Sequence, residues 1–561
     1  MRIKKTNDHL TVRCVAGSHV TLIGWSYPKA KCKGLLGFAI HRTDYIEEEA
    51  NWLRGMKTFQ STDPGLARGS LHSTRQHPIQ SFMWSDYSAK PGRKYTYRVV
   101  ALKGKPDDLK ISAETNVTIT TESPEDGLND VHFNRGAAGS QEYSRRFGDE
   151  RPDESNMDDP RWKWLSRGLF EGMVSFVEQA KAGDKLRVCA YEFHYIPFLK
   201  TLKAAVDRGV DLQVIYDAKN KPNKKTGKVF PRDANRKAAL HVGIKSKCIE
   251  RSEYKSAISH NKFIVRYKGD NPVSVWTGGT NFSAGGIFGQ SNVGEVAEHE
   301  GVAKKYAAYW ELLAKDPTGR SLRPEVDGLT PTPRGKPVKG TSVIFSPRGS
   351  DDILDWYVKL ANDAKESIFM TFAFGMNHRF KDVYRDSAAS LRFALMEKAV
   401  RPMAAGPKKD AEMADIKSLR FMDENLFAIG SHFRVNKFDN WLAERLTDLN
   451  KHVRYIHNKF MLIDPLSSDP IIVGGSANFS DASVKKNDEN MLVIRGNTRV
   501  ADIYIGEYMR LYSHHAFREF VSRRGRALSK LDHLRTDDWW KDYFGSGNRS
   551  RRRMYFSGIK S

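Results

Sequence analysis

The amino-acid sequence predicts an α/β fold in which two similar β/α halves face each other as a pseudo-dimer, preceded by an all-β sandwich. Three observations predict this fold. A short motif recurs at one constant offset, the segments around both copies alternate between helix-like and strand-like apolar patterns, and the amino-terminal region instead alternates apolar and polar residues in short runs. We expect the sandwich over residues 1–122, a linker and docking segment over 123–160, and the two halves over 161–330 and 331–561, the last with a basic tail.

The amino-terminal region has its clearest predicted strands at residues 21–25, 37–42 and 91–101. In the last of these, Tyr95 and Tyr97 share one face because residues two apart on a strand point to the same side. This pattern resembles a fibronectin type III or related immunoglobulin-like sandwich. The resemblance implies a binding or spacing module without chemistry of its own. Its partner is unknown, and docking and architecture are equally open as its role.

The two halves follow a common plan of helices and strands. In the first half we expect a β-α-β order, and hence a parallel sheet with flanking helices, from helices at 164–180, 198–208 and 302–314 and strands at 186–191 and 210–216. In the second half we expect helices at 353–365, 391–400 and 499–520 and strands at 367–374, 419–422 and 432–436.

The repeated motif carries the chemistry-bearing residues. His260-Asn261-Lys262-Phe263 returns as His457-Asn458-Lys459-Phe460, and a Gly-x-x-Asn-Phe-Ser run follows each copy, with its asparagine at Asn281 or Asn478. The residue numbers of matched positions differ by 197 throughout (457 against 260). A single copy would fit a buried structural histidine equally well. Two copies at one spacing favour a site that uses both.

The motif residues resemble the signature of the phospholipase D superfamily, which is His-x-Lys, an Asp separated from that Lys by four residues, and Gly-Ser-x-Asn. The second copy has the whole signature, with Asp464 in its usual place but a longer connection to the glycine. The first copy departs from it, because Tyr267 stands where the Asp would be and Gly279 replaces the Ser. The resemblance covers roughly residues 130–545, and Tyr267 leaves open how the first motif is braced.

Two histidines can cleave a phosphodiester in two steps. One neutral imidazole attacks phosphorus, and a second, protonated imidazole donates to the leaving oxygen. The lysines and asparagines of both motifs would stabilise the charge on the non-bridging oxygens, so no metal or cofactor is expected. The resemblance implies attack by His260 and proton donation by His457. The candidate catalytic residues are His260, Lys262, Asn281, His457, Lys459, Asn478, Glu295 and Glu489, of which the two glutamates would hold the far imidazole nitrogens.

Composition bears on the partner. Lys and Arg number 91 against 67 Asp and Glu, a formal net charge of +24, which favours a polyanion. We expect a metal-independent nuclease acting on DNA or RNA. The first alternative is a phospholipase D that hydrolyses membrane phospholipids at an anionic membrane, and the second is a catalytically silent binding protein.

Cysteine usage and the amino terminus bear on compartment. The four cysteines are scattered and predict neither a disulfide framework nor a zinc site. The first residues lack the apolar segment of a signal peptide, and no apolar run approaches a membrane span. We expect a cytoplasmic protein, and export without a signal peptide stays open.

Overall fold

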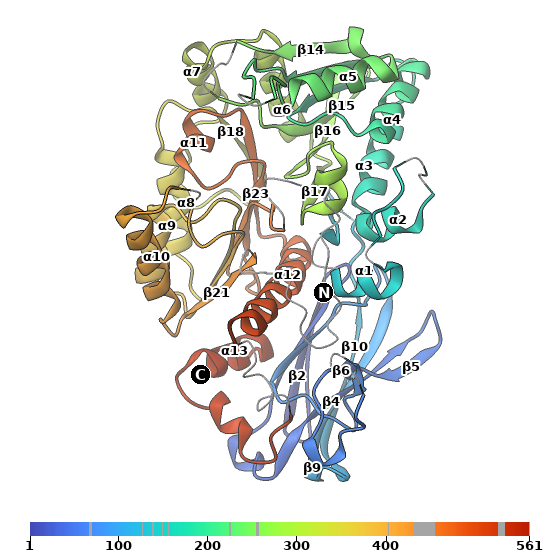
Figure 1. Ribbon diagram of the computed structural model, residues 1–561, viewed down its shortest axis with the longest axis vertical. Coiled ribbons are helices and arrows are strands. Elements are labelled where there is room, and N and C mark those ends of the chain that lie inside the picture. The colour runs from blue at the N-terminus through green and yellow to red at the C-terminus, as the bar shows by residue number, and fades with distance from the viewer. Residues whose placement is uncertain are drawn as a thin grey trace.

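The computed structural model describes residues 1–559 apart from 67–69, 126, 137–139, 149, 155, 157, 224–225, 254–256, 402, 431–454 and 525–532. The amino-terminal strands gather at one end of the molecule, and the two β/α halves lie side by side at the other (Figure 1). The predicted α/β class with an all-β amino-terminal region is confirmed. The predicted domain boundaries and the fibronectin type III likeness stay predictions.

The amino-terminal region consists of two sheets that share one apolar core around Trp25, Phe38 and Tyr97. In the described part of the chain each sheet has four strands: β1 (Arg2–Asn7), β2 (Leu10–Ala16), β3 (Thr21–Ser26) and β8 (Met83–Asp86) in the first, and β10 (Asp108–Thr120), β9 (Lys94–Lys105), β4 (Leu35–Asp44) and β5 (Glu49–Trp52) in the second. The short strands β6 (Arg54–Gly55) and β7 (His72–Ser73) pair beside them.

The carboxyl-terminal segment returns to this amino-terminal core. Trp539 and Trp540 are buried in it, and the Trp539 indole N–H donates to the Leu35 carbonyl at 2.8 Å. Helix α13 (Asn548–Ser557) crosses β3 at Gly24, where a β-carbon would lie 2.4 Å from the Phe556 backbone. Part of the predicted basic tail is therefore packed structure, which joins the two ends of the chain.

Both halves are built on a sheet with the same strand order. Among the described residues the first sheet runs β11 (Asn129–Phe133), β17 (Val293–Ala297), β16 (Asn271–Gly278), β15 (Lys262–Lys268), β12 (Lys185–Ala190), β13 (Asp211–Asp217) and β14 (Cys248–Arg251). The second runs β18 (Gly340–Ser346), β24 (Glu489–Arg495), β23 (Ile471–Gly475), β22 (Phe460–Ile463), β19 (Ser367–Phe372), β20 (Leu391–Met396) and β21 (Asn425–Ile429). Strand β11 comes from the segment predicted as a linker.

The sheets are mixed rather than parallel throughout. Among the described strands of these two sheets, only β12, β13 and β14, and likewise β19, β20 and β21, pair in parallel, whereas the strands that carry the motifs are antiparallel to their neighbours. The expected β-α-β order produced the parallel part. Each motif strand is instead followed by a short hairpin into β16 or β23, and a hairpin can only join antiparallel strands.

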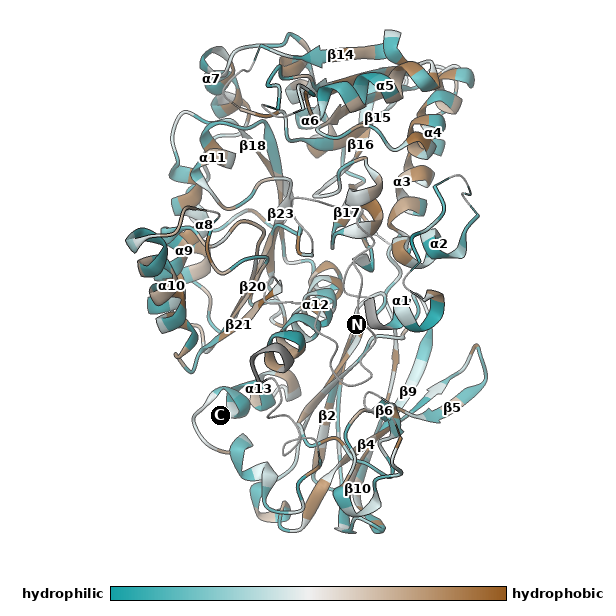
Figure 2. Cartoon of the chain, viewed as in Figure 1, coloured by the Kyte–Doolittle hydropathy of each residue, from teal (hydrophilic) through white to brown (hydrophobic). Residues whose placement is uncertain are grey.

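Helices pack against the sheets of both halves, and Figure 2 shows hydrophilic and hydrophobic residues alternating along them (Figures 1 and 2). In the first half they are α1 (Ser140–Phe147), α2 (Pro160–Ser166), α3 (Leu169–Glu178), α4 (Ile196–Asp207), α5 (Arg232–Val242), α6 (Glu300–Ala314) and α7 (Gly319–Leu329). In the second half they are α8 (Asp352–Asn362), α9 (His378–Asp386), α10 (Pro407–Arg420), α11 (Asp481–Lys485) and α12 (Thr498–Arg524). Within the described ranges, no helix is both long and apolar enough to span a membrane.

Three predicted elements are corrected. The helix at 164–180 is two helices, because Arg167 and Gly168 adopt left-handed backbone angles between α2 and α3. Residues 391–396 form the buried strand β20 rather than a helix, and residues 419–422 lie at the end of α10 rather than in a strand. Burial between two parallel neighbours overrides the helix preference of a Leu-, Ala- and Met-rich run. The strand predicted at 432–436 lies outside the described residues.

Candidate active site

The two motif histidines lie where the halves meet. The His260 backbone N–H donates to the Asp488 carbonyl of the second half at 3.0 Å, and the His457 backbone N–H donates to the Ser291 carbonyl of the first half at 3.3 Å. Asp488 and Ser291 are themselves separated by 197 residues, so each half holds the histidine of the other in the same way. The site therefore exists only where both halves are assembled.

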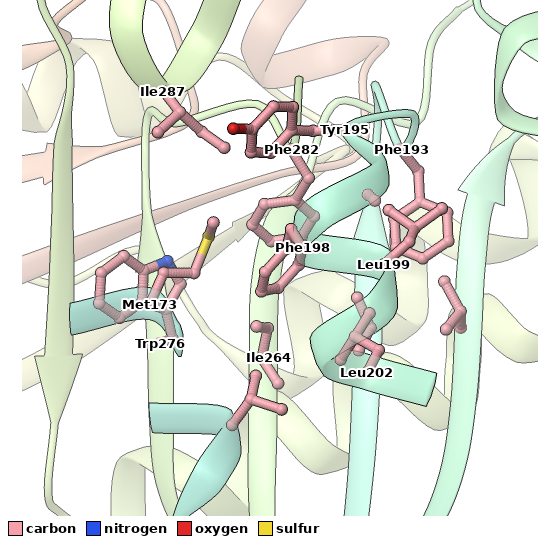
Figure 3. Close-up of a cluster of buried hydrophobic side chains, with 14 of the residues drawn as sticks. Met173, Phe193, Tyr195, Phe198, Leu199, Leu202, Ile264, Trp276, Phe282 and Ile287 are labelled. Carbon is pink, nitrogen blue, oxygen red and sulfur yellow. The ribbon is translucent and has the colours of Figure 1, made fainter. Parts of the chain in front are cut away.

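An apolar cluster packs against the segments that carry the first motif. Phe282, which follows Asn281, packs against Phe198 with ring centroids 5.0 Å apart, and Ile264 and Trp276 of the motif hairpin belong to the same cluster (Figure 3). Strand β15 is thus held in place by this cluster through Ile264. Lys262 is the first residue of this strand, and His260 lies two residues before it.

A buried carboxylate holds the residue before each histidine. Asp217, the last residue of β13, accepts the Ser259 N–H at 2.7 Å, and Glu397, directly after β20, accepts the Ile456 N–H at 2.9 Å. Asp217 ends β13 and Glu397 follows β20, and these two strands hold equivalent places in the two sheets. This role was not predicted from the sequence. The available signal was position, because Asp217 comes directly after the predicted strand at 210–216 and Glu397 comes directly after the observed strand β20.

Glu489 holds the far nitrogen of His260. Its Oε2 lies 2.9 Å from His260 Nδ1, and the two side chains come from opposite halves. Burial raises the Glu489 pKa to about 7, an effect opposed by the charge of Lys262. In its ionised form this carboxylate can only accept, and then Nδ1 carries the proton and Nε2 keeps a free lone pair.

Asn292 holds the far nitrogen of His457. Its Oδ1 lies 2.9 Å from His457 Nδ1, while its Nδ2 donates to the Gly286 carbonyl at 2.7 Å. Because the amide nitrogen is occupied, the oxygen faces the imidazole, which makes Nδ1 of His457 the donor. The buried Asn134 secures this arrangement, since its Oδ1 accepts the Asn292 backbone N–H at 2.9 Å.

Glu295 does not take this place. It is buried and accepts from the Tyr504 hydroxyl at 2.6 Å, and burial raises its pKa to about 7. The expectation that Glu295 braces a motif histidine is therefore corrected. The missed residue could have been found, because Asn292 stands 197 residues before Glu489 in the repeat.

The two lysines lie buried beside the histidines. The Nζ of Lys262 donates to the His260 carbonyl, and the Nζ of Lys459 donates to the His457 carbonyl at 2.5 Å. Burial lowers the Lys262 pKa to about 8, and burial together with the charge of Lys262 lowers the Lys459 pKa well below its usual value. Two buried, mutually repelling ammonium groups are stabilised by an anion placed between them.

The histidine pKa values reflect the same surroundings. Burial lowers the pKa of both imidazoles well below the usual range, and the positive charges of Lys262 and Lys459 lower them further. Both rings are therefore neutral near pH 7 without an anion. A bound phosphate would restore proton affinity to the ring it contacts, which is the requirement for a general acid.

Asn281 and Asn478 each have a buried Oδ1 without a hydrogen-bond partner in the described structure.

The first motif has Gly279 where the family signature has a serine, and this difference has a physical reason, because a β-carbon at Gly279 would lie 3.2 Å from Asn292 Oδ1. A serine at this position would crowd the amide that holds His457. In the other half Ser476 has room, and its hydroxyl accepts the Asn490 N–H at 3.0 Å.

The motif aspartate is structural. The carboxylate of Asp464 accepts the N–H groups of residues 365, 366 and 367 at 2.7–2.9 Å and so ties β22 to the start of β19. Tyr267 makes no such contact, and Arg187 lies over its ring at 5.9 Å. Asp184 braces the equivalent joint from the other strand, since it accepts the Gly269 N–H at 3.0 Å.

Comparison with known proteins is consistent with this geometry. The family model described as "Cardiolipin synthase, PLD-like domain" matches residues 174–313 and 397–511, which include both motif histidines. No curated protein matches the chain.

Similar solved structures include the phospholipase D family member Nuc from Salmonella typhimurium (25% identity, 25% of this chain and 84% of that chain, TM-score 0.21). Phosphatidylserine synthase from Haemophilus influenzae is also similar (10% identity, 62% and 85%, TM-score 0.42). Polyphosphate kinase from Porphyromonas gingivalis is a third (9% identity, TM-score 0.37), and the similarity spans 58% of this chain but only 43% of the kinase. The family match covers residues 174–313 and 397–511, and in these two ranges the chain is similar to a phospholipase D-like domain.

Proposed function

We propose that this chain is a nuclease that cleaves DNA or RNA through a phosphohistidine intermediate on His260, without a metal. The phospholipase D-like domain supports an enzyme that acts on phosphodiester bonds. The observation that carries the proposal is the unequal bracing of the two histidines. One imidazole is bound to a carboxylate, Glu489, and the other to a neutral amide, Asn292.

The carboxylate suits the nucleophile. When His260 Nε2 attacks phosphorus, the ring becomes positively charged, and Glu489 at 2.9 Å from Nδ1 stabilises that charge. The bond from phosphorus to the leaving oxygen breaks as the bond to Nε2 forms. Lys262 and Lys459 lie beside the two rings and would neutralise the non-bridging oxygens.

The amide suits the general acid. Asn292 fixes the orientation of His457 but adds no negative charge, so the protonated ring stays acidic enough to give its Nε2 proton to the leaving oxygen. In the second step the now neutral Nε2 takes a proton from water. The water oxygen then attacks phosphorus, the bond to His260 breaks, and both histidines regain their starting states.

The net charge of +24 favours nucleic acid as the substrate, because lysine and arginine contacts to phosphates supply affinity that does not depend on sequence. Wild type and His260→Ala should be incubated in EDTA with single- and double-stranded DNA, with RNA, and with phosphatidylcholine or phosphatidylglycerol vesicles. We expect cleavage of nucleic acid by wild type alone. Release of lipid headgroups, or equal activity of the two proteins, would contradict the proposal.

A further inference from the structure

We propose that a surface beside His260 binds a base and the adjoining phosphates of single-stranded nucleic acid. The surface, here called the Phe230 platform, is formed by Phe230, His194, Lys219 and Lys221. This inference rests on the proposed function and deepens it, because it names a single strand as the substrate form. It follows from four features of the described residues.

The first feature is an accessible aromatic ring. Phe230 follows β13 in a loop and is 52% exposed, so the apolar core does not account for it. Its ring lies 6.1 Å from that of His194 in an edge-to-face arrangement, which restricts its motion. A held but accessible aromatic ring is what a base needs for stacking.

The second feature is proximity to the candidate nucleophile. His194 lies three residues after Tyr191, whose ring is 5.1 Å from that of His260. Three residues span at most about 10 Å. The His194 N–H also donates to the Phe282 carbonyl at 3.1 Å, directly after Asn281. A strand whose phosphate reaches His260 therefore passes close to the platform.

The third feature is rigidity. Asn235, fully buried in α5, accepts the Phe193 N–H at 2.7 Å and donates to the carbonyls of Tyr191 at 2.9 Å and Asp217 at 3.3 Å. One side chain thus binds the loop after β12 to the loop after β13. The backbone next to His194 and near Lys219 is therefore held near the active site before any ligand arrives, which reduces the entropy cost of binding.

The fourth feature is unbalanced positive charge. Residues 219–237 contain eight Lys or Arg and one Asp. Neither Lys219 nor Lys221 forms an ion pair with any carboxylate in the described chain. Partial burial lowers the Lys219 pKa, and the charge of Lys221 lowers it further. A phosphate between the two ammonium groups would relieve this repulsion.

Together the ring and the lysines fit a single strand better than a duplex. In a duplex both faces of each internal base are covered by its neighbours, so an external ring cannot stack on it. An unpaired strand offers a base face and a phosphate at short spacing, and aromatic rings with flanking cations are the usual means of binding it.

The binding experiment uses the full-length His260→Ala protein, so that the labelled oligonucleotide is not cleaved. Fluorescence anisotropy with labelled oligothymidylate should show about tenfold weaker binding when Phe230→Ala is added, equivalent to about 1.4 kcal/mol. Phe230→Trp should retain binding. Phe421→Ala, which removes a 77% exposed phenylalanine at the end of α10, is the matched control and should bind normally.

Replacing Lys219 and Lys221 by glutamine should reduce the slope of log affinity against log salt by about 1.4, since each phosphate contact to a single strand contributes about 0.7. An unchanged slope would overturn the assignment of phosphates to these lysines. Equal weakening of blunt duplex binding in Phe230→Ala would overturn the single-strand preference.

Two further results would overturn the platform. One is identical binding by Phe230→Ala and Phe421→Ala. The other is loss of sedimentation with phosphatidylglycerol vesicles in Phe230→Ala without any change in oligonucleotide binding, which would assign Phe230 to a membrane contact. A different result would refute the proposed function alone. A protein that binds oligothymidylate through Phe230 but never cleaves it would support the Phe230 platform and contradict the nuclease activity.

Discussion

Replacing Asn292 by alanine should slow cleavage of a nucleic-acid phosphodiester by roughly 10- to 150-fold. The structure supplies this magnitude. The bond from His457 Nδ1 to Asn292 Oδ1 is 2.9 Å long and buried, and a hydrogen bond to a charged partner contributes about 1.5–3 kcal/mol. Its loss destabilises the protonated His457 that must donate to the leaving oxygen. The imidazole is also free to rotate once the amide is gone.

The assay compares two leaving groups on the same protein. An oligonucleotide releases a poor leaving group that needs the His457 proton, whereas thymidine 5′-(p-nitrophenyl phosphate) releases p-nitrophenolate, which leaves without protonation near neutral pH. Burst-phase kinetics should show Asn292→Ala slowing the first step on the oligonucleotide far more than on the nitrophenyl ester. Glu489→Gln is the matched control and should slow both, because His260 attacks in both reactions. Equal losses on the two substrates for Asn292→Ala would refute the assigned roles.

Three further outcomes are expected. The kcat/KM of wild type should fall as pH rises through about 8, the lowered pKa of Lys262, because only the protonated ammonium stabilises the phosphate. In a pH–rate profile, Lys262→Arg should shift this fall in kcat/KM to higher pH. Glu295→Gln should keep kcat. Burial raises the folded-state pKa of Glu295 from 4.5 to about 7, so wild type loses up to about 3 kcal/mol of stability as pH rises through this window, and thermal unfolding should show Glu295→Gln more stable than wild type only at alkaline pH. Asp464→Ala should lower the unfolding temperature, because three N–H groups lose their acceptor, while kcat per folded molecule stays unchanged; a large fall in kcat would argue for a catalytic Asp464.

The sequence predicted much of the fold because its signals are local. Apolar periodicity placed β12, β13 and β19 and most of the predicted helices correctly. The failures occurred where tertiary burial opposes local preference. Residues 391–396 are helix-forming by composition, yet they form β20, because both faces are covered between β19 and β21.

The candidate site shows the same division. The constant offset brought out the histidines, lysines and asparagines, and it contained Asn292 as the repeat partner of Glu489. It could not tell which side chain meets which imidazole. Glu295 and Asn292 are three residues apart on the chain, and only the packing of β17 sends Glu295 to Tyr504 while the preceding loop brings Asn292 to His457.

By itself, the sequence determined that two equivalent His-x-Lys motifs exist and which chemistry two such motifs can perform, because residue type and spacing are properties of the chain. Only the tertiary structure decided that each half supplies the partner of the histidine in the other, and that one partner is a carboxylate and the other an amide. Hydrogen bonds between residues more than 160 positions apart, such as those at 2.9 Å from Glu489 and Asn292, depend on how two sheets meet. No local pattern encodes that meeting.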